Sequence, residues 1–142
     1  MIVLLDTDAL SEILRSLPHP TVLRWFSSQA ESQMFVSAIT QAEMVSGASL
    51  LPEGKRQQRL QGALRELFEH DFVDRVMPFD DGSVVHFAQV VAARRRGGRP
   101  ISQFDAQIAA IALQNGMALA TRNVPDFEGC GLRLVDPWAQ GG

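Results

Sequence analysis

Several features that would point to common protein classes are scarce or missing in this chain of 142 residues. Its only cysteine, Cys130, cannot form an internal disulfide, which favours a reducing, cytoplasmic setting. No apolar run approaches the roughly 18 residues that a membrane-spanning helix needs, and no basic and then apolar signal segment precedes Leu4. We therefore expect a cytoplasmic protein that has no contact with a membrane.

Common catalytic signatures are missing as well. The sequence has no glycine-rich phosphate loop and no Gly-x-Ser-x-Gly turn, and His19, His70 and His86 lie outside the motifs described below. A net charge of −3 gives the chain as a whole no electrostatic attraction to nucleic acid. Any catalytic chemistry must therefore come from another kind of site.

Short apolar runs alternate with helical patterns along the chain. The runs predict strands over residues 2–5, 34–37, 73–77, 118–121 and 132–135. Apolar residues at helical spacing predict helices between these strands. Such an alternation is typical of βαβ units, so we expect an α/β fold with a mostly parallel sheet. Without a repeat or a low-complexity linker, the length is that of one domain.

Three acidic residues are predicted to meet at one edge of this sheet. Asp6 directly follows the first strand, Glu43 comes just after the second, and Asp105 opens the last helix. Glu43 and Asp105 should each fall in the first turn of a helix. Helix N-termini gather at the carboxyl edge of a parallel sheet, which is also where open α/β sheets bind ligands. The three carboxylates would then converge there.

Each acid also has a structural explanation. Ser/Thr-x-x-Glu is a capping box, so Thr40–Glu43 and, less ideally, Ser102–Asp105 can start helices. The helix dipole also favours an acid in the first turn. We interpret Asp8 as a polar or capping residue of the first helix. Asp6 is harder to explain, because an uncompensated carboxylate at the end of a buried strand is costly.

A fourth polar group is expected at the same edge. Asn123 and Asp126 follow the strand predicted over 118–121, and Phe127 beside them is best interpreted as a core residue. Oxygen ligands without histidine or cysteine suit Mg²⁺ or Mn²⁺ rather than zinc. Such a cluster can activate a water molecule and stabilise the leaving oxygen of a phosphodiester.

Five segments, taken together and in order, resemble the PIN-domain family. The resemblance is strongest to VapC and FitB-like toxins of bacterial type II toxin–antitoxin pairs, and it covers nearly the whole chain. The segments are Leu5–Asp8, Ser37–Glu43, Asp105–Ala112, Leu119–Phe127 and Asp136–Trp138.

The resemblance implies a single PIN-like domain over residues 1–142, an α/β/α sandwich with a central, mostly parallel sheet of four to five strands. It implies a Mg²⁺-dependent endoribonuclease, with Mn²⁺ able to replace Mg²⁺, that a small cognate antitoxin neutralises. By position, the catalytic residues would be Asp6, Glu43, Asp105 and Asn123. Asp6 and Asp105 would be the most direct metal ligands.

The fourth position is where this chain departs from the family pattern. Many members carry an aspartate there, whereas this chain has Asn123 and then Asp126. The asparagine can still offer a neutral carbonyl oxygen, which weakens metal affinity without abolishing it. The sequence leaves open which of the two residues acts, and whether one or two metals bind. Thr7 and Thr121 match small polar residues of the family beside the first acid and after the fourth strand.

Two other functions fit parts of the sequence. Asp6–Asp8 also matches the strand-end motif of haloacid dehalogenase-type phosphatases, with Asp80–Asp81 as a downstream acidic pair. However, the only lysine, Lys55, precedes that pair, and Asp80–Ser83 fits the start of a helix better. The second alternative is a non-catalytic module that binds an antitoxin or a DNA-bound complex.

Partner surfaces are expected on the first two helices and on one arginine cluster. The helices carry more large apolar side chains than a small core needs, which predicts a homodimer that binds an antitoxin and meets DNA only through it. The arginines are expected to hold the RNA backbone, because an acidic site repels phosphate; the dipole at a helix end is their other explanation. The apolar residues are Leu10, Ile13, Leu14, Leu17, Trp25 and Phe26, and the arginines are Arg94, Arg95, Arg96 and Arg99.

Overall fold

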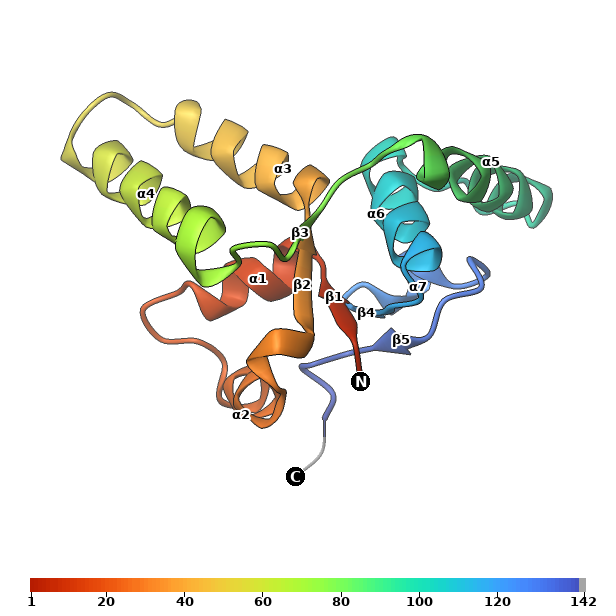
Figure 1. Ribbon diagram of the computed structural model, residues 1–142, viewed down its shortest axis with the longest axis horizontal. Coiled ribbons are helices and arrows are strands. Elements are labelled where there is room, and N and C mark those ends of the chain that lie inside the picture. The colour runs from red at the N-terminus through yellow and green to blue at the C-terminus, as the bar shows by residue number, and fades with distance from the viewer. Residues whose placement is uncertain (141–142) are drawn as a thin grey trace.

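A computed structural model describes residues 1–140, in which five parallel strands form one sheet with helices on both faces (Figure 1). The strands are β1 (Val3–Leu5), β2 (Met34–Ser37), β3 (Val76–Met77), β4 (Ala118–Ala120) and β5 (Leu134–Val135). The helices are α1 (Thr7–Ile13), α2 (Pro20–Ser28), η1 (Glu31–Gln33), α3 (Ala38–Ser49), α4 (Lys55–Glu66), η2 (Leu67–Asp71), α5 (Asp81–Arg96), α6 (Gln103–Gln114) and α7 (Val124–Phe127). None of the helices in this range is both long and apolar enough to cross a bilayer.

The sheet separates two apolar cores, because successive side chains of a strand point to opposite faces. Val3 and Leu5 belong to the core beneath α1–α4 and η2, whereas Leu4 belongs to the core beneath α5, α6 and α7 (Figure 1). All three side chains are buried, so β1 is covered on both faces, as its unbroken aliphatic run predicts. The predicted α/β/α sandwich is confirmed. The predicted domain bounds of 1–142 include residues 141–142, which lie outside the described residues.

The order of the strands determines where a ligand can bind. The sheet runs β3-β2-β1-β4-β5. The chain first adds β2 and β3 on one side of β1, and then returns through α5 and α6 to place β4 on the other side. The direction thus changes between β1 and β4, and open parallel sheets bind ligands outside the carboxyl ends of strands at such a point. Asp6 and Thr121 directly follow these two strands.

Three predicted elements are shorter than expected. The strand predicted over 132–135 covers only Leu134–Val135. The strand predicted over 73–77 begins only at Val76, because the φ angle of Asp74 is 61°, a left-handed conformation that a strand cannot contain. The first helix ends at Ile13 instead of continuing to Leu17. Pro18 disfavours helical backbone at the residue before it, and Leu17 is 85% exposed in the loop.

Candidate active site

Asp6 lies at the centre of the site and is also the N-cap residue of α1. Its backbone N–H donates to the carbonyl oxygen of Ala120 at 3.0 Å, which places it beside the end of β4. Its Oδ1 accepts a hydrogen bond from the backbone N–H of Ala9 at 2.8 Å. Asp6 is only 5% exposed. The carboxylate is therefore held at the carboxyl ends of the two central strands.

The surroundings of Asp6 disfavour its charge. Loss of hydration raises the pKa of Asp6 from 3.8 to about 6, while hydrogen bonds from Thr121 and from the Ala9 backbone oppose this rise. The charges of Asp8 and Asp105 raise the pKa further. The charged neighbours that influence Asp6 are thus acids, and the ionised carboxylate lacks a compensating positive charge.

Asp105 reaches the site from the first turn of α6, as predicted. Ser102 is the N-cap of this helix, and its Oγ accepts a hydrogen bond from the Asp105 backbone N–H at 3.2 Å. Burial raises the pKa of Asp105, a side-chain hydrogen bond from Ser102 to the carboxylate lowers it, and the charges of Asp126, Glu43 and Asp8 raise it. Carboxylates from α7, α3 and α1 are therefore near enough to Asp105 to disfavour its charge.

Glu43 joins the site from the second turn of α3, so its predicted place in a first-turn capping box is wrong. The helix begins directly after β2, with Ser37 as its N-cap, and the Ser37 Oγ accepts a hydrogen bond from the Thr40 N–H at 3.0 Å. Glu43 Oε1 instead accepts a hydrogen bond from Thr7 Oγ1 at 2.8 Å, and Thr7 Oγ1 also lies 3.0 Å from Thr40 Oγ1. This hydroxyl pair orients Glu43 toward the start of α1.

Asp8 is a polar residue in the first turn of α1, which is one of the two roles predicted for it, and the capping role belongs to Asp6. The Oδ2 of Asp8 accepts a hydrogen bond from Asn123 Nδ2 at 2.6 Å. The backbone N–H of Asn123 donates to Thr121 Oγ1 at 3.0 Å, which fixes the turn after β4. Asn123 therefore lies at the predicted edge of the sheet. Its partner Asp8 is 115 positions earlier in the chain, and no local pattern predicts this pairing.

Asp126 lies beside this turn, in the four-residue helix α7. The next residue, Phe127, is buried in the core with Leu4 and Ile108, which confirms its interpretation as a core residue. Asp126 is exposed, and its charge raises the pKa of Asp105. Asn123 and Asp126 thus both lie at the predicted edge, and the choice between them for the fourth position stays open.

The acids of this edge have no cationic partner within residues 1–140. The ion pairs in that range join Arg15 to Glu12, His70 to Glu66, Arg75 to Glu31 and Arg99 to Glu128. In the same part of the chain, no three acidic, histidine or cysteine side chains come close enough to enclose a metal by themselves. The predicted convergence of Asp6, Glu43 and Asp105 therefore does not form a ready-made cage, and an Mg²⁺ ion, which usually keeps several waters and takes one or two carboxylates, would not require one.

The acidic pair of the phosphatase alternative has a structural role. Asp80 is the N-cap residue of α5, and its carbonyl oxygen accepts a hydrogen bond from the Ser83 N–H at 2.9 Å. Asp81 is the first residue of that helix. The pair forms the start of a helix, as the sequence indicated, which removes one support for the phosphatase.

The arginine cluster is divided between buried and exposed residues. Arg94 is buried and its guanidinium donates only to backbone carbonyls, so the prediction that it holds the RNA backbone is wrong. Arg99 pairs with Glu128 and also donates to the Pro125 carbonyl. Arg95 and Arg96 are exposed, and their contact with RNA stays a prediction.

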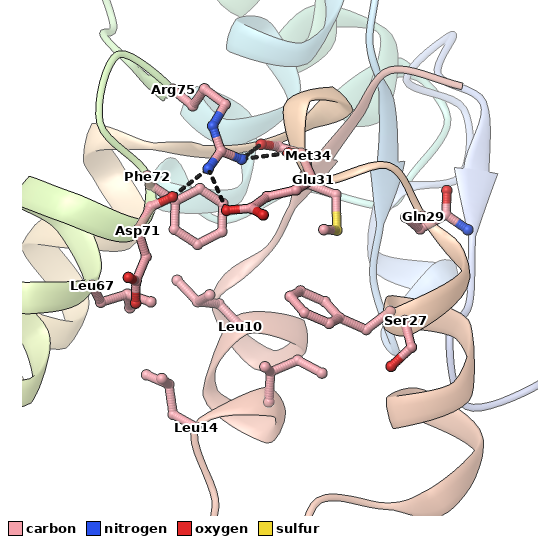
Figure 2. Close-up of a pocket in the computed structure, with 12 residues that line it drawn as sticks. Leu10, Leu14, Ser27, Gln29, Glu31, Met34, Leu67, Asp71, Phe72 and Arg75 are labelled. Atoms are coloured by element: carbon pink, nitrogen blue, oxygen red, sulfur yellow. Dashed lines mark hydrogen bonds and ion pairs between the residues drawn. The ribbon is translucent and has the colours of Figure 1, made fainter.

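A pocket of about 460 Å³ lies apart from the acidic edge, between α1, α2 and η2 (Figure 2). Leu10, Leu14 and Phe72 are among its apolar lining residues, and neither Asp6 nor Asp105 belongs to the lining. At its rim, the Arg75 guanidinium donates to the carbonyls of Met34, Glu31 and Asp71 (Figure 2). An apolar floor with a polar rim suits side chains of a protein partner better than a phosphate group.

We predict that Asp6→Asn leaves the metal-free protein at least as stable as the wild type at pH 7.5. The pKa of Asp6 in the folded protein is above the unfolded value, so the folded state binds the proton more tightly and the free energy of unfolding falls as pH rises from about 4 to 7. A shift of this size corresponds to at most roughly 3 kcal/mol. Asparagine keeps the N-cap and carries no charge, so the advantage of the variant should grow over this pH range.

Urea unfolding in EDTA between pH 4 and pH 7.5 measures this difference. Asp6→Ala is the matched control, because it loses both the charge and the cap and should be about 1 kcal/mol less stable than Asp6→Asn at each pH. A wild-type protein clearly more stable than Asp6→Asn at pH 7.5 would show that a positive group compensates the Asp6 charge, and the prediction would then be wrong.

Comparison with known proteins gives a consistent family. The PIN domain family model matches residues 3–125. The plasmid stability protein StbB of Pseudomonas syringae pv. tomato is 40% identical over 136 residues, which are 96% of this chain and 98% of the relative. VapC ribonuclease Y4jK of Sinorhizobium fredii is 35% identical over 96% of this chain and 97% of the relative. Toxin FitB of Neisseria gonorrhoeae is 34% identical, with coverage of 96% and 98%.

Solved structures agree with these relatives. A chain in the structure of FitAB bound to an IR36 DNA fragment matches with a TM-score of 0.92 at 34% identity, covering 99% of this chain and 98% of that chain. FitAcB from Neisseria gonorrhoeae matches with a TM-score of 0.87 at 32% identity, covering 96% and 99%. Because the family model and the relatives extend over nearly all of the sheet and the acidic edge, this chain belongs to the PIN-domain family, alongside the VapC and FitB proteins.

Proposed function

We propose that this protein is a Mg²⁺-dependent endoribonuclease that acts as the toxin of a type II toxin–antitoxin pair. The observation that carries the proposal is the meeting of Asp6 and Asp105 at the carboxyl ends of the two central strands, with no cationic partner among residues 1–140. The relatives include a protein named VapC ribonuclease and another named Toxin FitB. A tRNA(fMet)-specific endonuclease VapC of Shigella flexneri is 29% identical over 96% of this chain and 97% of the relative.

Asp6 and Asp105 would hold the cation, and Mn²⁺ could replace Mg²⁺ because both prefer oxygen ligands. The bound cation would supply an activated water and stabilise the leaving oxygen of the phosphodiester. Asp6 would offer one carboxylate oxygen, since the other caps α1. Asp105 would contribute from the first turn of α6, where Ser102 fixes its backbone.

The polar residues around this pair would orient water and substrate. Thr7 holds one carboxylate oxygen of Glu43, so the other is available to accept a proton or a hydrogen bond from water. Asn123 donates its amide N–H to Asp8, which leaves its carbonyl oxygen for the site. Arg122 comes directly before Asn123, is exposed, and lies 5.2 Å from the ring centre of Trp138. A guanidinium there would suit an RNA phosphate.

We predict that Asp6→Asn and Asp105→Asn each lower RNA cleavage at least about 100-fold, the scale on which the loss of one stabilising electrostatic group acts. Both variants should stay folded by circular dichroism, because asparagine preserves size and, at position 6, the helix cap. Cleavage of a labelled RNA by the purified protein, with Mg²⁺ and then with EDTA, measures the effect. Asp81→Asn, at the exposed start of α5, is the matched control and should cleave like the wild type.

The same assay separates the alternatives. Wild-type cleavage by either site variant would refute the assigned residues, and cleavage that EDTA does not stop would refute the role of the metal. Release of inorganic phosphate from a phosphomonoester, without RNA cleavage, would favour the phosphatase. Antitoxin binding without any turnover would favour the non-catalytic module.

The proposed partners are an antitoxin and a second copy of the chain. The structure of the relative FitAB holds a DNA fragment, and we infer that this protein also meets DNA through its antitoxin, as part of a homodimer. Of the apolar residues on α1 and α2, Leu10 and Trp25 complete the core, whereas Ile13, Leu14 and Phe26 remain partly exposed around the pocket of Figure 2. These three residues make the pocket the favoured contact for the antitoxin.

We predict that Leu14→Asp weakens antitoxin binding at least about tenfold, or about 1.4 kcal/mol, because it places a charge at an apolar contact. Leu14 is 39% exposed, so the change should leave the fold intact. Leu50→Asp is the matched control, since Leu50 is 85% exposed and does not line that pocket. Calorimetric titration with the small protein encoded by the neighbouring reading frame measures affinity. Equal affinities of both variants would place the antitoxin elsewhere.

A further inference from the structure

We propose that Arg94, assisted by Arg99, is a positioning residue of the active site: its guanidinium hydrogen-bonds both the turn that leads into α6 and the backbone of α7, and so fixes Asp126 and Asn123 relative to Asp105. The inference rests on the proposed function, because it concerns the placement of the same acids. It assigns Arg94 a role through other residues rather than contact with RNA.

The contacts of Arg94 are unusual for an arginine at a helix end. It is 6% exposed, whereas Arg95 and Arg96 beside it are exposed. Nε donates to the Arg99 carbonyl at 2.7 Å, and Nη1 donates to the carbonyls of Glu128 at 2.6 Å and Pro125 at 3.2 Å. None of the ion pairs within residues 1–140 includes it. Burial of a cation that donates only to backbone carbonyls is costly. We therefore interpret the role of Arg94 from these three hydrogen bonds.

Helix α7 needs such a support. With four residues it is too short to be stable by itself, and its last carbonyls have no partners within the helix. Phe127 anchors one side of α7 in the core. On the other side, Arg94 contacts Pro125 and Glu128, and Arg99 adds a bond from Nη2 to the Pro125 carbonyl at 2.7 Å and an ion pair with Glu128 at 3.2 Å. The two guanidinium groups thus hold the segment that carries Asp126.

The same arginine controls the approach to α6. The Arg99 N–H donates to the Arg94 carbonyl at 2.9 Å, while Arg94 Nε donates back to the Arg99 carbonyl, so the turn after α5 is closed in both directions. Gly98 permits this turn with a φ of 73°. Three residues after Arg99, Ser102 caps the helix whose first turn holds Asp105. Arg94 therefore links the backbone that leads to Asp105 with the backbone that surrounds Asp126.

The linked groups interact within the site. The charge of Asp126 raises the pKa of Asp105, so the two carboxylates are near enough to influence each other. Asn123, directly before α7, donates to Asp8 at 2.6 Å, and a shift of α7 would lengthen that bond. Loss of residues that support metal ligands from behind lowers metal affinity or activity by about 10- to 100-fold.

The test compares Arg94→Lys with the wild-type full chain. Lysine keeps the charge but cannot supply the planar fork that reaches carbonyls on two segments. Arg65→Lys is the matched control, because Arg65 is an exposed arginine in the last turn of α4. Mn²⁺ affinity is measured by calorimetry at a temperature where circular dichroism shows each variant folded. We expect about 10- to 100-fold weaker binding for Arg94→Lys and none of this loss for Arg65→Lys.

Hydrogen exchange of the metal-free protein gives a second readout. The amides of Asp126 and Cys130 donate to the carbonyls of Asn123 and Phe127, and their exchange should quicken in Arg94→Lys while that of β1 stays unchanged. If Arg94→Lys does not fold, Arg99→Gln decides instead. It removes the second guanidinium from Pro125, and we expect changes in the same direction but smaller.

The outcomes are distinct. A folded Arg94→Lys with wild-type Mn²⁺ affinity and unchanged exchange around α7 would overturn the inference. Faster exchange throughout the molecule, including β1, would reduce Arg94 to a general contributor to stability and would overturn it too. A wild-type protein that neither binds Mn²⁺ nor cleaves RNA would refute the proposed function instead, and the exchange measurement would still decide whether Arg94 holds α7.

Discussion

The buried negative charge of Asp6 is the constraint on which the rest of the site depends. Asp6 ends a strand that is covered on both faces, and its pKa is raised because the fold removes its water and surrounds it with other acids. Hydrogen bonds from Ala9 and Thr121 only partly offset this cost. A cation that binds only the folded chain would relieve the repulsion and would stabilise the fold by an amount that grows with the ratio of its concentration to its dissociation constant. The interaction between the cation and the acids would thus contribute to both stability and activity.

Much of the fold, and the positions of Asp6 and Asp105, could be predicted from local sequence. The aliphatic run before Asp6 specified a doubly covered strand, and Ser102 with Asp105 specified a helix start. The predicted position of Glu43 in the first turn of α3 was wrong because both Ser37 and Thr40 are residue types that can cap a helix. Ser37 is the actual cap, since α3 follows β2 without a loop, and helix propensity alone does not reveal the missing loop. The strand order, which brings β4 beside β1, likewise follows from packing rather than from local sequence.

The spacing of Arg94 along its helix would have predicted its burial. Arg94 lies four residues after Val90 and eleven after Ser83, and all three are buried on the same side of α5. That spacing places it on the inner face of the helix, unlike Arg95 and Arg96. Helical phase would therefore have separated the structural arginine from the exposed ones. The bond between Asp8 and Asn123 had no such signal, because it joins the two ends of the chain through the order of the strands.

The helix cap at Asp6 also bears on which cation the site can accept. Asp6 Oδ1 accepts the Ala9 N–H and the carboxylate also accepts a hydrogen bond from Thr121, so a cation that took both oxygens would compete with the helix cap. Ca²⁺ often takes both oxygens of a carboxylate, whereas Mg²⁺ is satisfied with one and fills its octahedron with water. Two-oxygen coordination at Asp6 would cost α1 its cap, about 1 kcal/mol. In a metal-bound protein, the start of this helix would therefore favour, of two ions of equal charge, the ion that requires fewer carboxylate oxygens.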